Sequence, residues 1–155
     1  MLVVLILGSP SDREFARKIT DGLDSLGIPW KLHIASAHKT PRHLLNLLDS
    51  YQSEPQLVFI TVAGRSNALG GFVDAQVAAP VITCPPYSDR FSGSDIFSSL
   101  RMPSGVAPAV VLEPAAAALL AAKMLGLVDK NLVERVNALQ DEQRQRLLKA
   151  DADQR

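Results

Sequence analysis

The sequence predicts a doubly wound α/β domain, in which helices cover both faces of a mostly parallel sheet. Two apolar runs, Leu2–Leu7 and 57–63, are rich in branched residues, as is typical of strands that are buried on both faces. A segment with helical periodicity follows each run, and this alternation implies right-handed crossovers between parallel strands. No repeat, low-complexity tract or linker divides the chain, so we expect one domain over residues 1–155.

The remaining elements follow the same alternation. The turn at 8–12 leads into a helix that Gly27 ends, a second strand is expected over 28–35, and Pro41 suits the first turn of a leucine-rich helix. The second half of the chain is expected to continue in this order: strand 57–63, helix 68–72, strand 80–83, helix 95–100, strand 109–112, helix 114–125 and helix 130–150.

The helix expected over 114–125 has the sequence PAAAALLAAKML and is apolar on nearly every side. A helix of this kind must be buried all round, which a domain of this size hardly achieves alone. The last helix adds further residues that need cover, Leu132, Val133, Val136 and Leu139. We therefore expect a homo-oligomer in which the C-terminal helix packs against other subunits. The alternative is that the alanines simply reflect their high helix propensity.

The composition argues against several classes of protein. Lysine plus arginine number 16 and aspartate plus glutamate also 16, so the basic excess of a nucleic-acid-binding protein is missing. With Cys84 as its one cysteine, the chain forms no internal disulfide, which favours a cytoplasmic location. The apolar N-terminus lacks a basic leader, and no apolar run approaches the roughly 20 residues of a membrane span. We expect neither nucleic acid nor membrane as a partner.

Ligands of an open parallel sheet bind beyond the carboxyl ends of its strands, so the loops there are the candidate sites. The first loop reads GSPSD. Its Ser9 and Ser11 offer hydroxyl groups, and the helix start after it presents free N–H groups that suit a phosphate, although Pro10 removes one of them. The alternative for Ser11 and for Asp12 is a plain helix cap.

The second loop, SAHKTP, places a hydroxyl, a proton-transfer group and a cation together in Ser36, His38 and Lys39. In the alternative interpretation, His38 hydrogen-bonds its own backbone and Lys39 is a solvated surface charge. The three histidines of the chain lack the spacing and the supporting cysteines or carboxylates of a zinc site, so no metal is expected.

The third loop, AGRSNALGG, lets a ligand approach the backbone closely, while Arg65 and Asn67 offer donors. It matches neither the phosphate loop GxxxxGK[ST] nor the dinucleotide pattern GxGxxG, which argues against ATP and NAD. In the fourth loop, Cys84 is interpreted as a core thiol at a strand end, because no base accompanies it.

The segments GSPSD, SAHKTP, AGRSNALGG, CPP and SSLRMPSG occur in this order along the chain. Over nearly its whole length the sequence resembles the aminoimidazole ribonucleotide (AIR) carboxylase family, often called PurE. Class I members of that family are mutases of N5-carboxyaminoimidazole ribonucleotide and carry AGGAAHLPG in the third loop. Class II members carboxylate AIR directly. This chain looks like class II, since Ala68 stands where class I has a second histidine and Lys39 replaces the usual arginine.

The resemblance implies a flavodoxin-like three-layer fold, an octamer, and a carboxy-lyase that converts AIR and CO2 to 4-carboxy-5-aminoimidazole ribonucleotide (CAIR) in purine biosynthesis. It implies no metal, biotin or ATP. By motif match, His38 would be the catalytic base. The ribonucleotide would be bound by Ser9, Ser11, Asp12, Ser36 and Lys39. The carboxylation pocket would be lined by Arg65, Ser66 and Asn67.

Three other functions stay open. The nearest is the class I mutase reaction on the same fold. A second is a non-catalytic nucleotide-binding module, which would bind AIR without turnover. A third is a related carboxylase that acts on a different heterocycle.

Overall fold

The computed structural model describes residues 1–154, apart from the side chains at positions 90 and 91. Its centre is a parallel sheet of five strands in the order β2-β1-β3-β4-β5, which is the flavodoxin-like order. The strands are β1 (Leu2–Leu7), β2 (Trp30–Ile34), β3 (Leu57–Val62), β4 (Val81–Thr83) and β5 (Ala109–Val110). The predicted doubly wound α/β class is therefore confirmed.

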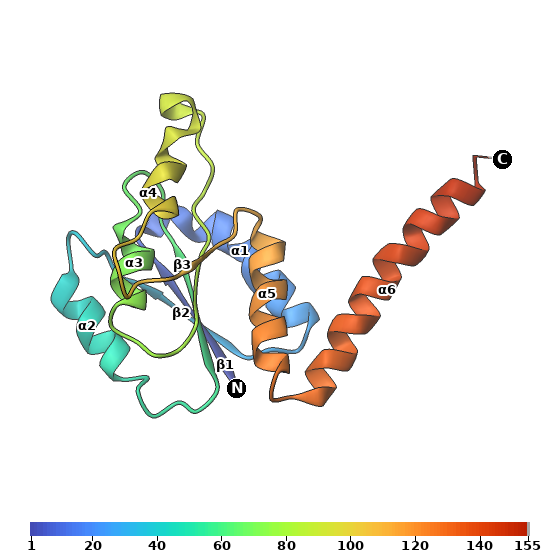
Figure 1. Ribbon diagram of the computed structural model, residues 1–155, viewed down its shortest axis with the longest axis horizontal. Coiled ribbons are helices and arrows are strands. Elements are labelled where there is room, and N and C mark those ends of the chain that lie inside the picture. The colour runs from blue at the N-terminus through green and yellow to red at the C-terminus, as the bar shows by residue number, and fades with distance from the viewer. Residues whose placement is uncertain (155) are drawn as a thin grey trace.

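Helices lie on both faces of this sheet (Figure 1). They are η1 (Pro10–Asp12), α1 (Arg13–Ser25), α2 (Pro41–Asp49), α3 (Ala68–Asp74), η2 (Arg90–Ile96), α4 (Phe97–Leu100), α5 (Pro114–Gly126) and α6 (Lys130–Ala152). The core on one face holds α1 and α5, together with the start of α6. The core on the other face holds α2 and α3.

The apolar run of β1 is continuous because it serves both cores. Val3 and Leu5 pack into the core of α1 and α5, whereas Val4 and Ile6 pack into the core of α2 and α3. Alternate side chains of a strand point to opposite faces, so a strand with a helix layer on each side has no polar positions. This arrangement explains why the run lacks the alternating pattern of a half-exposed strand.

Strand β5 is shorter than the predicted strand 109–112, because its neighbour ends early. After β4 ends at Thr83, the chain continues through Cys84 into two prolines, which have no N–H group for hydrogen bonds between strands. The N–H of Val111 still reaches the carbonyl of Thr83, at 3.0 Å, and pairing stops there. The helix expected over 95–100 is also divided, into the end of η2 and the four residues of α4.

Much of the alanine-rich helix α5 is buried against other elements of the same chain. Ala118 is fully buried in the core that α5 forms with α1. The two helices approach closely at Gly22 of α1, where an added Cβ would lie 2.9 Å from the Cβ of Ala118. Small residues on both helices therefore allow this close contact, a packing role that neither sequence interpretation of the alanines included.

We expect Gly22→Val to lower the free energy of unfolding by about 1–3 kcal/mol, the usual cost of overpacking a tight contact. The cause is the steric clash with Ala118, a rigid neighbour that has no side-chain torsion with which to move aside. Thermal denaturation measures the change. Asp21→Val is the matched control, because position 21 is exposed on the same helix and carries the same cost of a branched residue. Equal melting temperatures for the two variants would contradict the contact.

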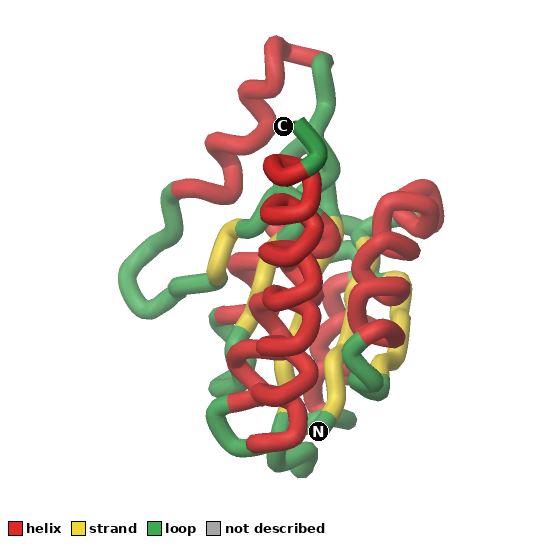
Figure 2. The backbone as a smooth tube through the Cα atoms, turned by 90° about the vertical axis from the view of Figure 1, so that its right-hand side faces the viewer, coloured by secondary structure: helices red, strands yellow, loops and turns green. Residues whose placement is uncertain are grey.

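Helix α6 leaves the body of the protein after its first turns (Figure 1), and Figure 2, which looks at the molecule from its side, shows it as the outermost element. Its buried residues are Leu132 and Val136, both near its start. Farther along, Leu147 and Leu148 are 74% and 63% exposed. Among the helices described, none is long and apolar enough to span a membrane.

Candidate functional site

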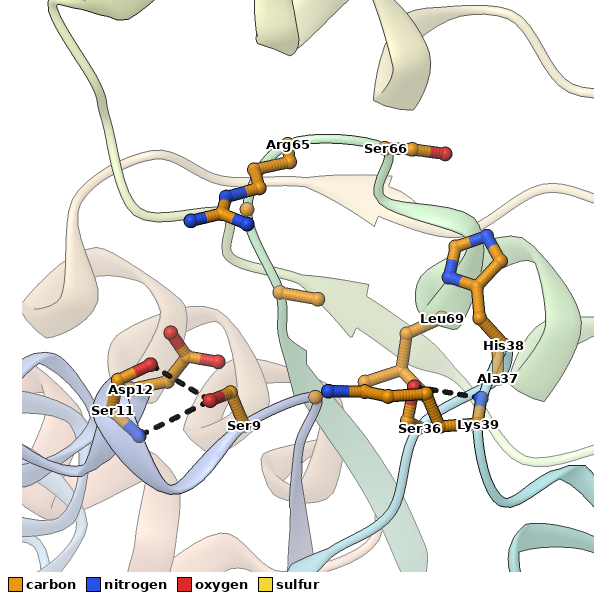
Figure 3. Close-up of a pocket in the computed structure, with 13 residues that line it drawn as sticks. Ser9, Ser11, Asp12, Ser36, Ala37, His38, Lys39, Arg65, Ser66 and Leu69 are labelled. Atoms are coloured by element: carbon orange, nitrogen blue, oxygen red, sulfur yellow. Dashed lines mark hydrogen bonds between the residues drawn. The ribbon is translucent and has the colours of Figure 1, made fainter.

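Three strand-end loops meet at an open cavity of about 390 Å³ (Figure 3). The loops follow β1, β2 and β3, the adjacent strands at which the strand order reverses. From β1 the chain runs to α1 on one face, and from β3 it runs to α3 on the other, so the two loops diverge and leave a crevice. All the predicted site residues except Asn67 line this cavity.

The loop after β1 is organised by Ser9. Its hydroxyl accepts a hydrogen bond from the N–H of Ser11, at 3.3 Å, and lies 2.8 Å from the hydroxyl of Ser11. Ser9 thereby caps η1, while the carboxylate of Asp12 makes no capping bond at the start of α1. The cap interpretation thus applies to Ser9, and the Asp12 side chain stays turned toward the cavity.

Burial raises the pKa of the Asp12 carboxyl group, and a backbone hydrogen bond from Ser9 and the charge of Arg65 oppose this shift in part. The ionised carboxylate is therefore less stable in the folded protein than in the unfolded chain. A half-buried charge that costs stability fits a group kept for binding a ligand.

Asp12→Asn is expected to raise the melting temperature at pH 7 while it weakens substrate binding. Above the raised pKa of Asp12, the wild-type protein carries a charge that burial disfavours, and the amide does not. Below the ordinary pKa of 3.8 the carboxyl group is neutral in both states, so the gain should vanish there. Melting curves at several pH values measure this. A gain that persisted undiminished at low pH would show that burial of the charge is not its cause.

The loop after β2 forms a closed turn that presents His38 and Lys39. The hydroxyl of Ser36 accepts the N–H of Lys39 at 3.2 Å, and the hydroxyl of Thr40 accepts the N–H of Ser36 at 2.9 Å. The imidazole of His38 is exposed and has no hydrogen-bond partner among the residues that the structure describes, so the backbone-bonded alternative does not apply. Lys39 extends across the cavity toward Ser9 (Figure 3).

The loop after β3 contributes Arg65 and Ser66 to the opposite wall. Arg65 has a φ of 58°, the left-handed conformation that costs a non-glycine residue about 1–3 kcal/mol. Its guanidinium group points toward the side of the cavity that Ser9, Ser11 and Asp12 form, and Ser66 lies nearer His38 (Figure 3). Cations from two loops, Lys39 and Arg65, therefore face the hydroxyl groups of the first loop.

Asn67 lies beneath its loop and does not line the cavity, which differs from the expectation that it would line a carboxylation pocket. Its side chain is 2% exposed, and its Nδ2 donates to the hydroxyl of Thr83 at 2.7 Å and to that of Ser99 at 2.9 Å. Both N–H bonds of the amide are thus occupied by protein partners. Asn67 is placed to hold the loop, and the residues on either side of the amide come from β4 and α4.

Cys84 is a core thiol, as its position at a strand end predicts. Burial, with a smaller contribution from the charge of Glu113, raises its pKa to about 12. The thiolate that a nucleophile needs is therefore scarce at neutral pH. Within residues 1–154, no group of histidine, cysteine, aspartate and glutamate side chains has the arrangement of a metal site.

A second hollow, of about 760 Å³, adjoins the cavity and shares Asp12 and residues 64–66 with its wall. Tyr87, Asp95 and Ser98 contribute to its wall, so the chain between β4 and α4 borders the site. Ser98 and Ser99 belong to the segment SSLRMPSG, one of the motifs of the family resemblance, and the sequence predicts no role for them. The pairing of two adjacent serines with Asn67 is a contact between distant parts of the chain, and no local pattern signals it.

The fold and the site define a flavodoxin-like α/β protein with a histidine and two cations around one cavity. The sequence matches the family "AIR carboxylase" over residues 2–146, and the chain belongs to this family of carboxy-lyases.

Its curated relatives include phosphoribosylaminoimidazole carboxylase of Archaeoglobus fulgidus, 52% identical over the whole chain and 86% of the relative. The enzyme of the same name from Treponema denticola is 48% identical over 97% of the chain and 96% of the relative. The crystal structure of Treponema denticola PurE superimposes with a TM-score of 0.96 at 46% identity, and the match covers 98% of this chain and 97% of that one.

Proposed function

We propose that this protein is an AIR carboxylase, which joins CO2 to C4 of AIR and forms CAIR without ATP, metal or other cofactor. The observation that carries the proposal is the convergence of His38, Lys39 and Arg65 with the hydroxyl groups of the first loop on one cavity. Family membership and two relatives named phosphoribosylaminoimidazole carboxylase, 52% and 48% identical, support the same activity.

The ribonucleotide phosphate binds at the first loop in this account. The hydroxyls of Ser9 and Ser11 and the ammonium of Lys39 supply donors there, and the helix that follows adds the positive end of its dipole. Pro10 has no N–H, and the N–H groups of Ser11 and Asp12 are already bonded to the hydroxyl and the carbonyl of Ser9, so the contact from this loop is made by the two hydroxyls. Asp12 and Ser36 then meet the ribose, and the aminoimidazole ring lies toward His38.

The chemistry needs a positioned base more than a strong electrophile. AIR is an electron-rich enamine, whose electron pair at C4 forms the new bond to the carbon of CO2, while a C–O π pair moves to oxygen as the carboxylate. C4 then carries both a hydrogen and the carboxylate. His38 takes this proton, and the C–H electron pair restores the aromatic ring. Imidazole is the side chain that most readily takes up and releases a proton near neutral pH, which suits that step.

CO2 binds on the side of the third loop. A small molecule with little charge is held by a tight, partly dry space with oriented donors, which also meet the carboxylate as it develops. The cavity wall there contains Ala63 and Gly64, whose small size leaves room, and Arg65 and Ser66, which offer donors.

Direct carboxylation, the class II reaction, is the form we propose. Lys39 and the loop AGRSNALGG support it, since Ala68 occupies the position of the second class I histidine. Two parallel assays test this proposal with purified protein in the absence of ATP. One supplies AIR and bicarbonate, and the other supplies N5-carboxyaminoimidazole ribonucleotide. CAIR formed from AIR and bicarbonate supports class II. Product from the N5-carboxylated substrate alone would assign the mutase reaction, and binding of AIR without turnover would leave a non-catalytic module.

The working form is a cytoplasmic homo-oligomer, and an octamer is what the family resemblance implies. Exposed apolar side chains among residues 1–154 support an oligomer. They include Leu127, Val128, Leu147 and Leu148, which are all more than half exposed. A projecting helix that ends in exposed leucines is stabilised when a second copy buries them.

Leu147→Glu combined with Leu148→Glu is expected to reduce the mass of the assembly, because two charges replace apolar contacts between subunits. Light scattering after size-exclusion chromatography measures this mass. The control is Gln143→Glu with Gln145→Glu, which adds the same charge to exposed positions of the same helix. If both double variants keep the wild-type mass, the end of α6 does not form the interface.

A further inference from the structure

The short helix α4 is tied to the loop after β3 by its two serines. The hydroxyl of Ser98 accepts a hydrogen bond from the N–H of Asn67 at 3.1 Å and donates to the carbonyl of Arg65 at 3.1 Å. The hydroxyl of Ser99 accepts from the side-chain amide of Asn67 at 2.9 Å. Segments more than thirty residues apart in sequence are thus joined at the two peptide groups that flank Ser66.

The other end of this connection is fixed to the sheet. The Asn67 amide also donates to the hydroxyl of Thr83, the last residue of β4, at 2.7 Å. Asn67, Thr83 and Ser99 are all buried, so these bonds form in a poorly solvated environment where an unmade bond is costly. The loop after β3 is therefore anchored to β4 through the side chain of Asn67, and it is held on its exposed side by the hydroxyl of Ser98.

The connection acts where the backbone is strained. Arg65 has its φ at 58°, in a region that a long side chain adopts only when its surroundings hold it there. The hydroxyl of Ser98 contacts the carbonyl of this residue directly and the second N–H after it. This conformation sends the guanidinium group over the cavity toward Asp12 (Figure 3).

We propose that Ser98 is a positioning residue of the substrate site, which acts by holding Arg65 in its left-handed conformation with the guanidinium over the cavity. The proposal rests on the proposed function, because it concerns how the same cavity binds its substrate. Ser98 contributes to the wall of the neighbouring hollow and not to that of the cavity itself, so its effect passes through the loop.

Competition limits the size of the effect. Ser98 has one hydroxyl proton, and the carbonyl of Asp95 lies nearer to its oxygen, at 2.8 Å, than the carbonyl of Arg65 does. The bond that Ser98 accepts from Asn67 survives whichever carbonyl receives the proton. Loss of the Ser98 hydroxyl therefore removes the bond from the Asn67 N–H and the bond that the carbonyls of Arg65 and Asp95 share. We expect a moderate loss of substrate affinity.

The test is a double-mutant cycle on carboxylation of AIR, made with the variants Ser98→Ala and Arg65→Ala. We expect Ser98→Ala to lower kcat/KM by about tenfold, mainly through a higher KM, which is the scale of one or two lost hydrogen bonds. In the Arg65→Ala background the same change should have little further effect, since the group it positions is gone. Ser98→Thr, which keeps the hydroxyl, should restore most of the activity.

One control variant and two contrary outcomes separate this role from a structural one. Ser53→Ala removes an exposed hydroxyl far from the site and should leave KM unchanged. A lower melting temperature for Ser98→Ala with an unchanged KM would overturn the proposal, and so would effects of Ser98→Ala and Arg65→Ala that multiply in full. If the wild-type protein does not carboxylate AIR, the proposed function fails instead. A crystal structure of Ser98→Ala then decides the positioning role, which requires Arg65 to leave the positive φ region.

Discussion

His38→Asn is expected to lower the kcat of AIR carboxylation by about 100-fold or more, the usual contribution of a general base, while AIR still binds. Asparagine keeps a polar side chain of similar size but cannot accept the C4 proton and carry it as a cation. The imidazole is exposed to the cavity and has no hydrogen-bond partner in the described part of the chain, so its replacement breaks no hydrogen bond there. Steady-state kinetics and calorimetric titration with AIR measure the two quantities.

The matched control is His43→Asn, on the exposed surface of α2, which should be as active as the wild-type protein. Near-normal turnover of His38→Asn would remove this histidine from the mechanism. An equal loss of AIR affinity would instead indicate that the imidazole binds the ring and does not act as the base.

Lys39→Ala is expected to weaken nucleotide binding by up to about 3 kcal/mol, the scale of a hydrogen bond to a charged group. The ammonium extends toward Ser9 across the cavity (Figure 3), where the proposed phosphate position lies between it and the start of η1. Because the charge contacts the phosphate in the bound state and in the transition state alike, KM should rise more than kcat falls.

Titration calorimetry with AIR, at constant ionic strength, measures the affinity directly. Lys18→Ala removes an exposed cation of α1 that lies outside the cavity lining and serves as the control. An affinity for AIR equal to that of the wild-type protein would return Lys39 to the solvated surface and would move the phosphate elsewhere.

The local sequence pattern was sufficient to predict the strands and loops on which the site is built. The runs of β1 and β3 predicted doubly buried strands, and their order along the chain predicted the loops that meet at the cavity. The family resemblance was likewise confirmed by the match over residues 2–146. The single domain over residues 1–155 and the roles of the individual site residues stay predictions.

Long-range contacts explain the differences. The orientation of Asn67 depends on Thr83 and Ser99, which lie 16 and 32 residues away, far beyond the neighbours that a residue meets within one helix or strand. The fit of Ala118 against Gly22 likewise joins two helices that four strands separate in sequence. The end of β5 was misplaced because the prolines that limit it belong to its neighbour.

A crystal structure of the protein with AIR or CAIR bound tests the central claim most directly. The account predicts the phosphate beside Ser9 and Lys39, and a ring nitrogen of His38 within about 3–3.5 Å of C4, the separation at which a reacting pair is productive. An imidazole that points away from the heterocycle, or a first loop without phosphate, would contradict it.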